Sequence, residues 1–237
     1  MNTASTICAI STPPGTGGIA VIRVSGQNAF SCVNKFFVPR KKDTDIFQQS
    51  PYTLNLGCFM NARKETIDDV LIGIFRAPHS YTGEDVVEIS CHGSVYIQQQ
   101  ILQTLIDAGC SLAKPGEFTQ RAFLNKKMDL SQAEAVADLI AADSAASHRM
   151  ALNQMRGGIS EELKNLRTRL LDFVSLTELE LDFSEEDVEF ADRSQLMALA
   201  NEIEELILKL SNSFKVGNAL KNGIPVAIVG ETNVGKS

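Results

Sequence analysis

Tryptophan is absent from this sequence, basic residues are in the minority, and long hydrophobic runs are missing. Without tryptophan, intrinsic fluorescence is a poor reporter of folding or binding. The 22 lysines and arginines are outnumbered by 29 aspartates and glutamates, which gives a formal charge of −7. A general nucleic-acid coat protein would be basic, so that class is disfavoured. No segment approaches the roughly 18 apolar residues of a membrane span.

The start of the chain shows no targeting signal, because no basic residue precedes Arg23 and prolines and glycines break the apolar run. The five cysteines form no C-x-x-C pair. This argues against a disulfide framework and a zinc knuckle, and for a reducing compartment. The remaining composition is that of an ordinary globular protein. We therefore expect a cytoplasmic protein without membrane contact, and 237 residues suit two domains or two and a fragment.

One stretch carries the whole excess of negative charge. Eight acids and no base lie between residues 178 and 192, and removing them takes the formal charge from −7 to +1. Two interpretations stay open. The run is a solvated helix end with its loop, or it is a face that attracts a basic partner or repels RNA.

The first 125 residues mix short apolar runs with turns. Strands are expected at residues 6–12, 19–25, 52–60, 70–75 and 85–91, and helices at 27–37 and 95–108. Residues 38–51 show little periodicity and are expected to form a surface excursion. We predict an α+β fold, with a mixed α/β domain at residues 1–125.

Helical spacing dominates after residue 125. Ser131 and Glu134 have the spacing of a capping box, which opens a predicted helix that ends at residues 157–158. Ser160 is expected to cap a second helix, and a third carries an apolar stripe in the region 196–210. Amphipathic helices of this kind bury their stripes against one another, so residues 126–216 are predicted to be a helical bundle domain.

The last residues combine a strand with a phosphate-binding pattern. Residues 224–229 form a short apolar run, as in a buried parallel strand, and residues 230–237 read G-x-x-x-x-G-K-S. In such a loop backbone N–H groups cradle phosphates, the lysine reaches the β- and γ-phosphates, and the serine ligates Mg²⁺. The nucleotide-binding candidates are Gly230, Asn233, Val234, Gly235, Lys236 and Ser237, with Ser237 also the magnesium ligand.

The rest of a nucleotide-binding domain would follow Ser237. Residues 217–237 are therefore expected to be the truncated start of that domain. The chain by itself is expected not to hydrolyse nucleotide, because the helix under the phosphates and the other motifs are not part of the sequence.

Two charged residues interrupt apolar strands. Arg23 alternates with Ile19 and Val21, and Glu88 lies within the run 86–89. The arginine extends to water from an edge strand, or it serves a binding site. The carboxylate pairs with Arg23, or it accepts hydrogen bonds from the amino edge of a ligand. The residues alone leave these alternatives open.

Four blocks together resemble the MnmE family of tRNA-modification GTPases, also called TrmE. They are TPPGTGGI at 12–19 with IRVSG at 22–26, SYTGEDVVE at 80–88 with CHG at 91–93, KPGEFTQRAFLN at 114–125 with DL at 129–130 and QAEA at 132–135, and the terminal GETNVGKS. The resemblance covers nearly the whole chain, with the blocks in the family's order.

The resemblance implies a three-part protein. It implies a tetrahydrofolate-binding domain that forms homodimers and a helical domain with an inserted Ras-like GTPase domain. With the FAD-containing partner MnmG, in a heterotetramer, the family modifies the wobble uridine of tRNAs with a one-carbon unit from a folate. Potassium-stimulated GTP hydrolysis drives its conformational cycle, so the full-length protein would be a GTP hydrolase acting in tRNA processing.

The resemblance also implies roles for individual residues. Positions for 5-formyl- or methylene-tetrahydrofolate coincide with Arg23, Glu88 and Lys127, although Lys127 by itself reads as surface charge. The family's potassium ligand coincides with Asn233. The family's C-terminal cysteine motif lies outside this sequence, so no catalytic residue is expected in the chain. Two alternatives remain: a dimerisation scaffold with no working folate site, and a free-standing folate-dependent aminomethyltransferase, which the long helices and the P-loop argue against.

Overall fold

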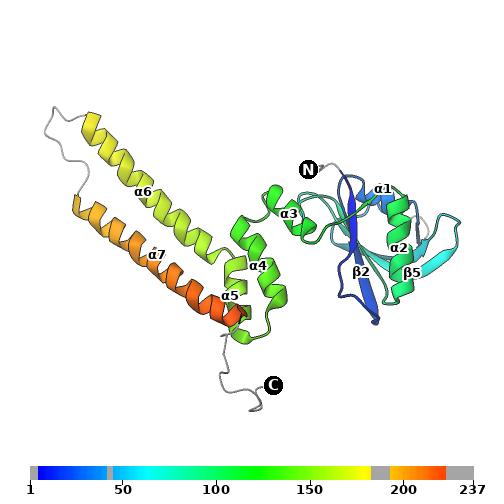
Figure 1. Cartoon of the computed structure of the whole chain (residues 1–237). Coiled ribbons are helices and arrows are strands. Elements are labelled where there is room, and N and C mark those ends of the chain that lie inside the picture. Colours follow the sequence, from blue (N-terminus) through cyan, green and yellow to red (C-terminus); the bar gives the residue numbers. More distant parts are fainter. Residues whose placement is uncertain (1–4, 42–44, 183–192, 223–237) are drawn as a thin grey trace, which may run out of the picture. The chain divides into compact units, whose positions relative to one another are not determined.

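The computed structural model describes residues 5–41, 45–182 and 193–222 (Figure 1). The chain divides into two compact units, Met1–Ala133 and Glu134–Ser237. The first unit is a mixed α/β structure and the second is helical. The predicted fold class, an α+β domain followed by a helical domain, is confirmed.

A sheet forms the frame of the first unit. Within the described residues it has seven strands in the order β3-β4-β5-β6-β2-β1-β7. Neighbouring strands are antiparallel except for the parallel pair β1–β7. The strands are β1 (Ile7–Ile10), β2 (Ile19–Ser25), β3 (Phe37–Pro39), β4 (Thr53–Met60), β5 (Thr66–Phe75), β6 (Val86–His92) and β7 (Ser111–Leu112).

Two helices cover one face of the sheet; the other, called the open face below, exposes apolar side chains, although the loop at residues 76–85 buries Ser25 on it. Helices α1 (Ala29–Asn34) and α2 (Val95–Asp107) pack against the strands and enclose the hydrophobic core (Figure 1). Strand residues alternate between the two faces. Accordingly Ile22 and Ile89 are fully buried, whereas Ile19 and Leu54 are 71% and 68% exposed. The two interrupting charges belong to the open face.

The prediction of a surface excursion at residues 38–51 was wrong at two points. Strand β3 pairs with β4 at the edge of the sheet, and Ile46 is fully buried in the core. The close pairing depends on Gly57, because a side chain there would overlap the Val38 carbonyl oxygen and the Phe37 ring. This pairing depends on a residue of the partner strand, so the sequence of residues 38–51 shows no alternating pattern that would predict it.

The second unit consists of long helices. α6 (Gly158–Asp182) and α7 (Arg193–Asn222) run side by side in Figure 1, and both contact α5 (Ala145–Met155). A further helix, α4 (Leu130–Ala141), precedes them. The sequence predicted one continuous helix from residue 131 to 157. That prediction was wrong, because α4 ends at Ala141 and a new helix begins after Ser144.

The start signals of these helices also differ from the prediction. Asp129, not Ser131, makes the reciprocal cap of α4: its Oδ1 accepts from the Gln132 N–H at 2.8 Å, and Gln132 Oε1 accepts from the Asp129 N–H at 2.9 Å. Aspartate caps a helix as well as serine, and its charge favours the helix N-terminus. The capping box that the chain does form with serines joins Ser144 and Ser147 at the start of α5.

Several sequence predictions fall outside the described residues. They are the strand at residues 224–229, the phosphate-binding residues 230–237 and the acidic positions 183–192. Helix α7 includes residue 217 and ends at Asn222. Among the helices of the described ranges, none combines the length and hydrophobicity needed to cross a bilayer.

Candidate functional site

Arg23 and Glu88 are direct cross-strand partners. The register of β2 and β6 places them opposite each other on the open face. Arg23 Nε donates a hydrogen bond of 2.9 Å to Glu88 Oε1, and Arg23 Nη2 lies 2.7 Å from the same oxygen in an ion pair. Their side chains are 24% and 29% exposed. Of the alternatives that the sequence left open, the pairing of Glu88 with Arg23 is the one observed, and it places both charged groups of the predicted site in one spot.

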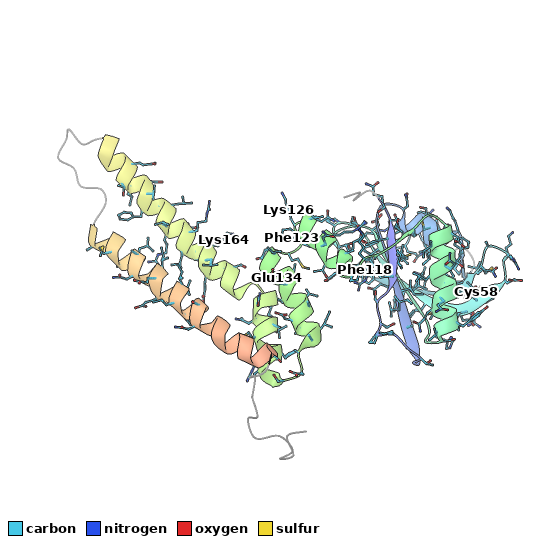
Figure 2. The ribbon with its side chains drawn as sticks, viewed as in Figure 1. Cys58, Phe118, Phe123, Lys126, Glu134 and Lys164 are labelled. Carbon is cyan, nitrogen blue, oxygen red and sulfur yellow. The ribbon has the colours of Figure 1, made fainter. Side chains whose placement is uncertain are left out.

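Two aromatic rings flank the Arg23 guanidinium. Its Cζ lies 5.1 Å from the centroid of the Tyr81 ring and 5.4 Å from that of Phe118. Phe118, labelled in Figure 2, belongs to α3 (Glu117–Leu124), and Tyr81 belongs to the loop between β5 and β6. The Tyr81 hydroxyl shares a hydrogen bond of 2.8 Å with the hydroxyl of Thr119. Arg23 is thus enclosed by rings from two segments that the sequence analysis did not assign to the site.

The loop that carries Tyr81, residues 76–85, is held against β2 by side-chain hydrogen bonds. The Ser25 hydroxyl is 2.7 Å from the Thr82 hydroxyl and donates to Glu84 Oε2, also at 2.7 Å. Ser25 and Thr82 are fully buried. These buried hydrogen bonds fix the loop relative to the strand that carries Arg23.

Arg121 fastens the same loop to α3. It is only 3% exposed and donates to Glu84 Oε1 at 3.1 Å, to Glu117 Oε1 at 3.1 Å and to the Ser5 carbonyl oxygen at 2.8 Å. Burial alone would raise the pKa of Glu117, but hydrogen bonds from the Lys114 N–H and from Arg121 outweigh it and hold that pKa below its ordinary value. The cation and its two carboxylates compensate one another inside the fold.

Lys127 also borders this loop. Its Nζ donates to the Pro78 carbonyl oxygen at 3.0 Å, and its side chain is exposed. Beside it, Asn125 Nδ2 donates to the Thr82 carbonyl oxygen at 2.7 Å. Gly83 has a φ of +77°, and a side chain there would press on Asn125 and Lys127. Arg23, Glu88 and Lys127 therefore meet around one loop, with Lys127 at its Pro78 end and Arg23 at Tyr81.

A histidine–aspartate pair occupies another position on β6. His92 Nδ1 is 2.7 Å from Asp68 Oδ1, and the His92 N–H donates to Asp68 Oδ2 at 2.8 Å. Asp68 lies 24 residues before His92, on the adjacent strand β5, so no local sequence pattern indicates this pair. Among the described residues no group of three or more histidine, cysteine or acidic side chains is placed to hold a metal ion.

The cysteines are not arranged as activated nucleophiles. All five are free, and only Cys58 is not buried. Burial raises the pKa of Cys32 and of Cys91 to about 11, so both remain thiols at neutral pH. A hydrogen bond with Cys110 lowers the pKa of Cys8, but that thiol is inside the core. The cysteines therefore add no catalytic group to the site.

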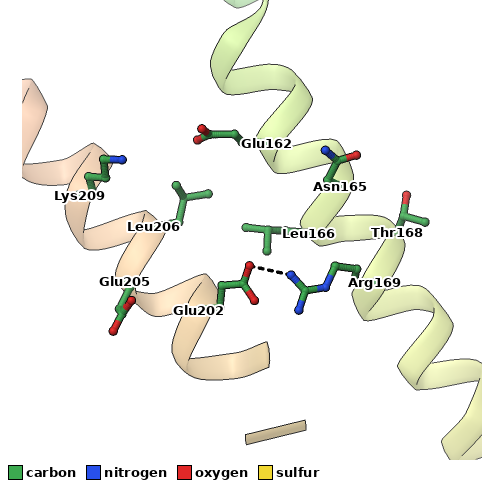
Figure 3. A pocket seen from close by; sticks show the side chains of 9 residues that line it. All are labelled: Glu162, Asn165, Leu166, Thr168, Arg169, Glu202, Glu205, Leu206 and Lys209. Atoms are coloured by element: carbon green, nitrogen blue, oxygen red, sulfur yellow. Dashed lines mark hydrogen bonds and ion pairs between the residues drawn. The ribbon is translucent and has the colours of Figure 1, made fainter. Parts of the chain in front are cut away.

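A separate groove lies between the two long helices of the second unit. It has a volume of about 860 Å³. Figure 3 shows Leu166 and Leu206 pointing toward each other across it, and the ion pair between Arg169 and Glu202, at 2.6 Å, bridges the helices. Arg169 and Glu202 are about half exposed, so the groove has no buried polar group that would define a chemical site.

The predicted nucleotide-binding residues Gly230, Asn233, Val234, Gly235, Lys236 and Ser237 lie outside the described residues. Their arrangement, and with it the potassium and magnesium ligation expected of Asn233 and Ser237, stays a prediction.

Comparison with known proteins finds matches over both units. A family model for the N-terminus of the GTP-binding protein TrmE matches residues 6–127, and one for the MnmE helical domain matches residues 130–225. Proteins named tRNA modification GTPase MnmE are 65% identical over 234 residues in Parabacteroides distasonis, 64% over 232 in Bacteroides fragilis, and 60% over 231 in Flavobacterium johnsoniae. Each alignment covers 98% of this chain and 51%, 50% and 49% of the relative. The chain thus spans about half the length of the curated relatives it matches.

Proposed function

Because this chain belongs to the MnmE (TrmE) family, we propose that it is the folate-binding, dimerising and helical part of a tRNA modification GTPase. The observation that carries the folate assignment is the Arg23–Glu88 pair, half-buried on an open sheet face and bordered by the loop that also contacts Lys127. Two opposite charges beside an aromatic ring suit a polar, planar ligand better than they suit water.

The donor and acceptor atoms of the pair fit the edge of a pterin. Arg23 uses Nε and Nη2 on one oxygen of Glu88, which leaves its Nη1 and the second Glu88 oxygen, Oε2, without a hydrogen bond to any residue that the structure describes. A carboxylate oxygen of this kind can accept a charge-assisted hydrogen bond from the amino group or ring N–H of a heterocycle. When bound, 5-formyl- or methylene-tetrahydrofolate would supply a one-carbon unit. Lys127 retains N–H donors for the ligand's carboxylates.

In the intact protein we propose the activity that the relatives' name states, GTP hydrolysis in tRNA modification. GTP would bind at residues 230–237, with Lys236 on the phosphates, Ser237 on magnesium and Asn233 on potassium. The target would be the wobble uridine, reached in the cytoplasm through a complex with the FAD-containing MnmG. The family resemblance supports these assignments.

Titration of 5-formyl-tetrahydrofolate into the 237-residue chain tests the folate site. Replacing Arg23 with alanine removes a charged donor and leaves Glu88 unpaired. We expect the affinity measured by calorimetry to fall roughly 10- to 150-fold, the equivalent of about 1.5–3 kcal/mol for a hydrogen bond to a charged group. Arg63, an exposed arginine of the same unit, is the matched control, and its replacement by alanine should change nothing.

Binding that is absent, or that Arg23→Ala leaves unchanged, favours the second candidate function, a scaffold that dimerises without a folate site. One observation favours it specifically: Arg23 and Glu88 already compensate each other's charge, so the pair is stable without a ligand. Glycine-cleavage activity would instead indicate a free-standing aminomethyltransferase.

We propose that the open sheet face forms the homodimer. Ile19, Leu54 and Leu56 are exposed on this face, and the strand registers place them on three successive rows of cross-strand neighbours. Leu54→Glu would place a charge in that contact, and we expect the dimer dissociation constant from sedimentation equilibrium to rise at least about tenfold. Tyr96→Glu is the matched control, because Tyr96 is also 68% exposed but lies on α2, which covers the other face. An equal effect of both variants would contradict this interface.

A further inference from the structure

The aromatic rings around Arg23 are a feature that charge pairing does not require. A salt bridge between neighbouring strands forms without any third group, yet Tyr81 and Phe118 both approach the guanidinium, at 5.1 and 5.4 Å from its Cζ. Rings at this distance attract a cation through their negative faces. The guanidinium is therefore held by three side chains from three separate segments: β6, the loop 76–85 and α3.

Each ring is anchored independently of Arg23. The Tyr81 hydroxyl is bonded to Thr119, and the residue after Tyr81, Thr82, is fixed by Ser25 and Asn125. Phe118 belongs to α3, whose position depends on the buried Arg121. The rings are thus a preformed frame into which the arginine fits.

The rings restrict the orientation of the guanidinium relative to Glu88. Nε donates to Glu88 Oε1 and Nη2 is ion-paired with the same oxygen, and Nη1 and Glu88 Oε2 have no hydrogen bond to any residue that the structure describes. A guanidinium on a three-carbon stem has many rotamers, and without a frame the orientation of Nη1 would vary from molecule to molecule.

We propose that Tyr81 and Phe118 are positioning residues of the folate site. They hold the Arg23 guanidinium against Glu88, so that the remaining N–H groups of Arg23 and the Oε2 atom of Glu88 are available to the amino-pyrimidinone edge of the pterin. The inference rests on the proposed function for its ligand, but not for the frame itself. Preorganisation of this kind increases affinity because the ligand no longer has to order the side chain.

The test uses the whole chain, two readouts and five variants. Tyr81→Leu and Phe118→Leu each remove one ring, Tyr81→Phe keeps the ring but loses the bond to Thr119, and Phe47→Leu is a control for a partly exposed ring elsewhere in the unit. Arg23→Lys identifies the Arg23 Nε–H resonance in a proton–nitrogen correlation spectrum by its disappearance. Calorimetric titration of 5-formyl-tetrahydrofolate gives the affinity.

We expect either leucine variant of the frame to shift the Arg23 Nε–H resonance downfield, because a shielding ring current is lost, and to weaken folate binding roughly 2- to 30-fold. Tyr81→Phe, which keeps the ring, should show nearly the wild-type resonance position and folate affinity. Phe47→Leu should leave both unchanged. The rescue by phenylalanine separates positioning from a loss of folding, which unchanged melting temperatures also check.

An unmoved resonance in both leucine variants would overturn the frame, whatever the affinity. A moved resonance with wild-type affinity, in a protein whose folate binding Arg23→Ala weakens as expected above, would overturn the role of the frame in positioning. If the wild-type chain binds no folate, the proposed function fails and the positioning role fails with it, while the resonance alone still decides whether the rings hold Arg23.

Discussion

Arg121→Met is expected to lower the free energy of unfolding of the N-terminal unit by about 3–5 kcal/mol, as for removal of one partner of a buried ion pair. The guanidinium is 3% exposed and bonds Glu84, Glu117 and the Ser5 carbonyl oxygen. Methionine fills much of the volume but leaves two carboxylates and a carbonyl without their donor. Urea unfolding followed by circular dichroism measures the change, since the chain has no tryptophan.

The same variant should alter the response to acid. The pKa of Glu117 lies below its unfolded value, so this carboxylate stabilises the fold above the ordinary glutamate pKa of about 4.3, and the contribution is lost as the pH falls through the lowered value. Without Arg121, acid should destabilise the protein less steeply in that range.

Glu84→Gln added to Arg121→Met should recover part of the loss, because the second unpaired charge is removed. If Arg121→Met lowers the free energy of unfolding by less than about 1 kcal/mol, the Arg121 ion pairs contribute no more than an exposed surface pair does, and the prediction is wrong.

Gly26→Ala is expected to lower the free energy of unfolding by about 3–5 kcal/mol, from backbone strain and overpacking together. Gly26 has a φ of +135°, a conformation that alanine rarely adopts, and a Cβ there would lie 2.7 Å from the Thr6 Cα. Neither side can give way easily. The Gly26 carbonyl oxygen accepts from the Ala29 N–H and the Gly26 N–H donates to the Asp85 carbonyl oxygen, both at 3.0 Å. Thr6 immediately precedes β1.

Gly109 provides the matched control for this prediction. Its φ is +105°, but a Cβ there would meet nothing within 4 Å. Gly109→Ala therefore carries strain without overlap, and we expect a loss of about 1–2 kcal/mol. Equal losses from the two variants, measured by the same urea unfolding, would show that the Thr6 contact is unimportant.

Hydrophobic periodicity predicted those strands and helices that have one buried face and one exposed face. The alternation around Ile22 and Ile89 predicted β2 and β6 nearly to their ends, since one face is buried and the other is not. It failed where the structure has no periodic signal. The three residues of β3 are too short to alternate visibly, and the break between α4 and α5 is flanked by alanines, whose high helix propensity favours one continuous helix.

The candidate site was predictable where a residue conflicts with its local surroundings. Arg23 and Glu88 are charges in apolar strands, and the structure pairs them in register. Tyr81 and Phe118 carried no comparable conflict, because an aromatic residue in a polar block is common in any exposed loop. Their only signal was membership of the blocks at 80–88 and 114–125, which predicted importance without predicting a neighbour.

Composition and spacing alone determined the class of this protein: two kinds of domain, an acidic chain, a terminal phosphate-binding pattern and two charges that need a partner. These properties depend on neighbours along the chain, which a sequence displays directly. Only the tertiary structure decided that Glu88 faces Arg23, that two rings enclose the guanidinium and that Arg121 fastens the loop beside them. These contacts join segments separated by 37 residues (Glu84 and Arg121) to 95 residues (Arg23 and Phe118), and they arise from the register of strands and the docking of α3. No local pattern encodes them.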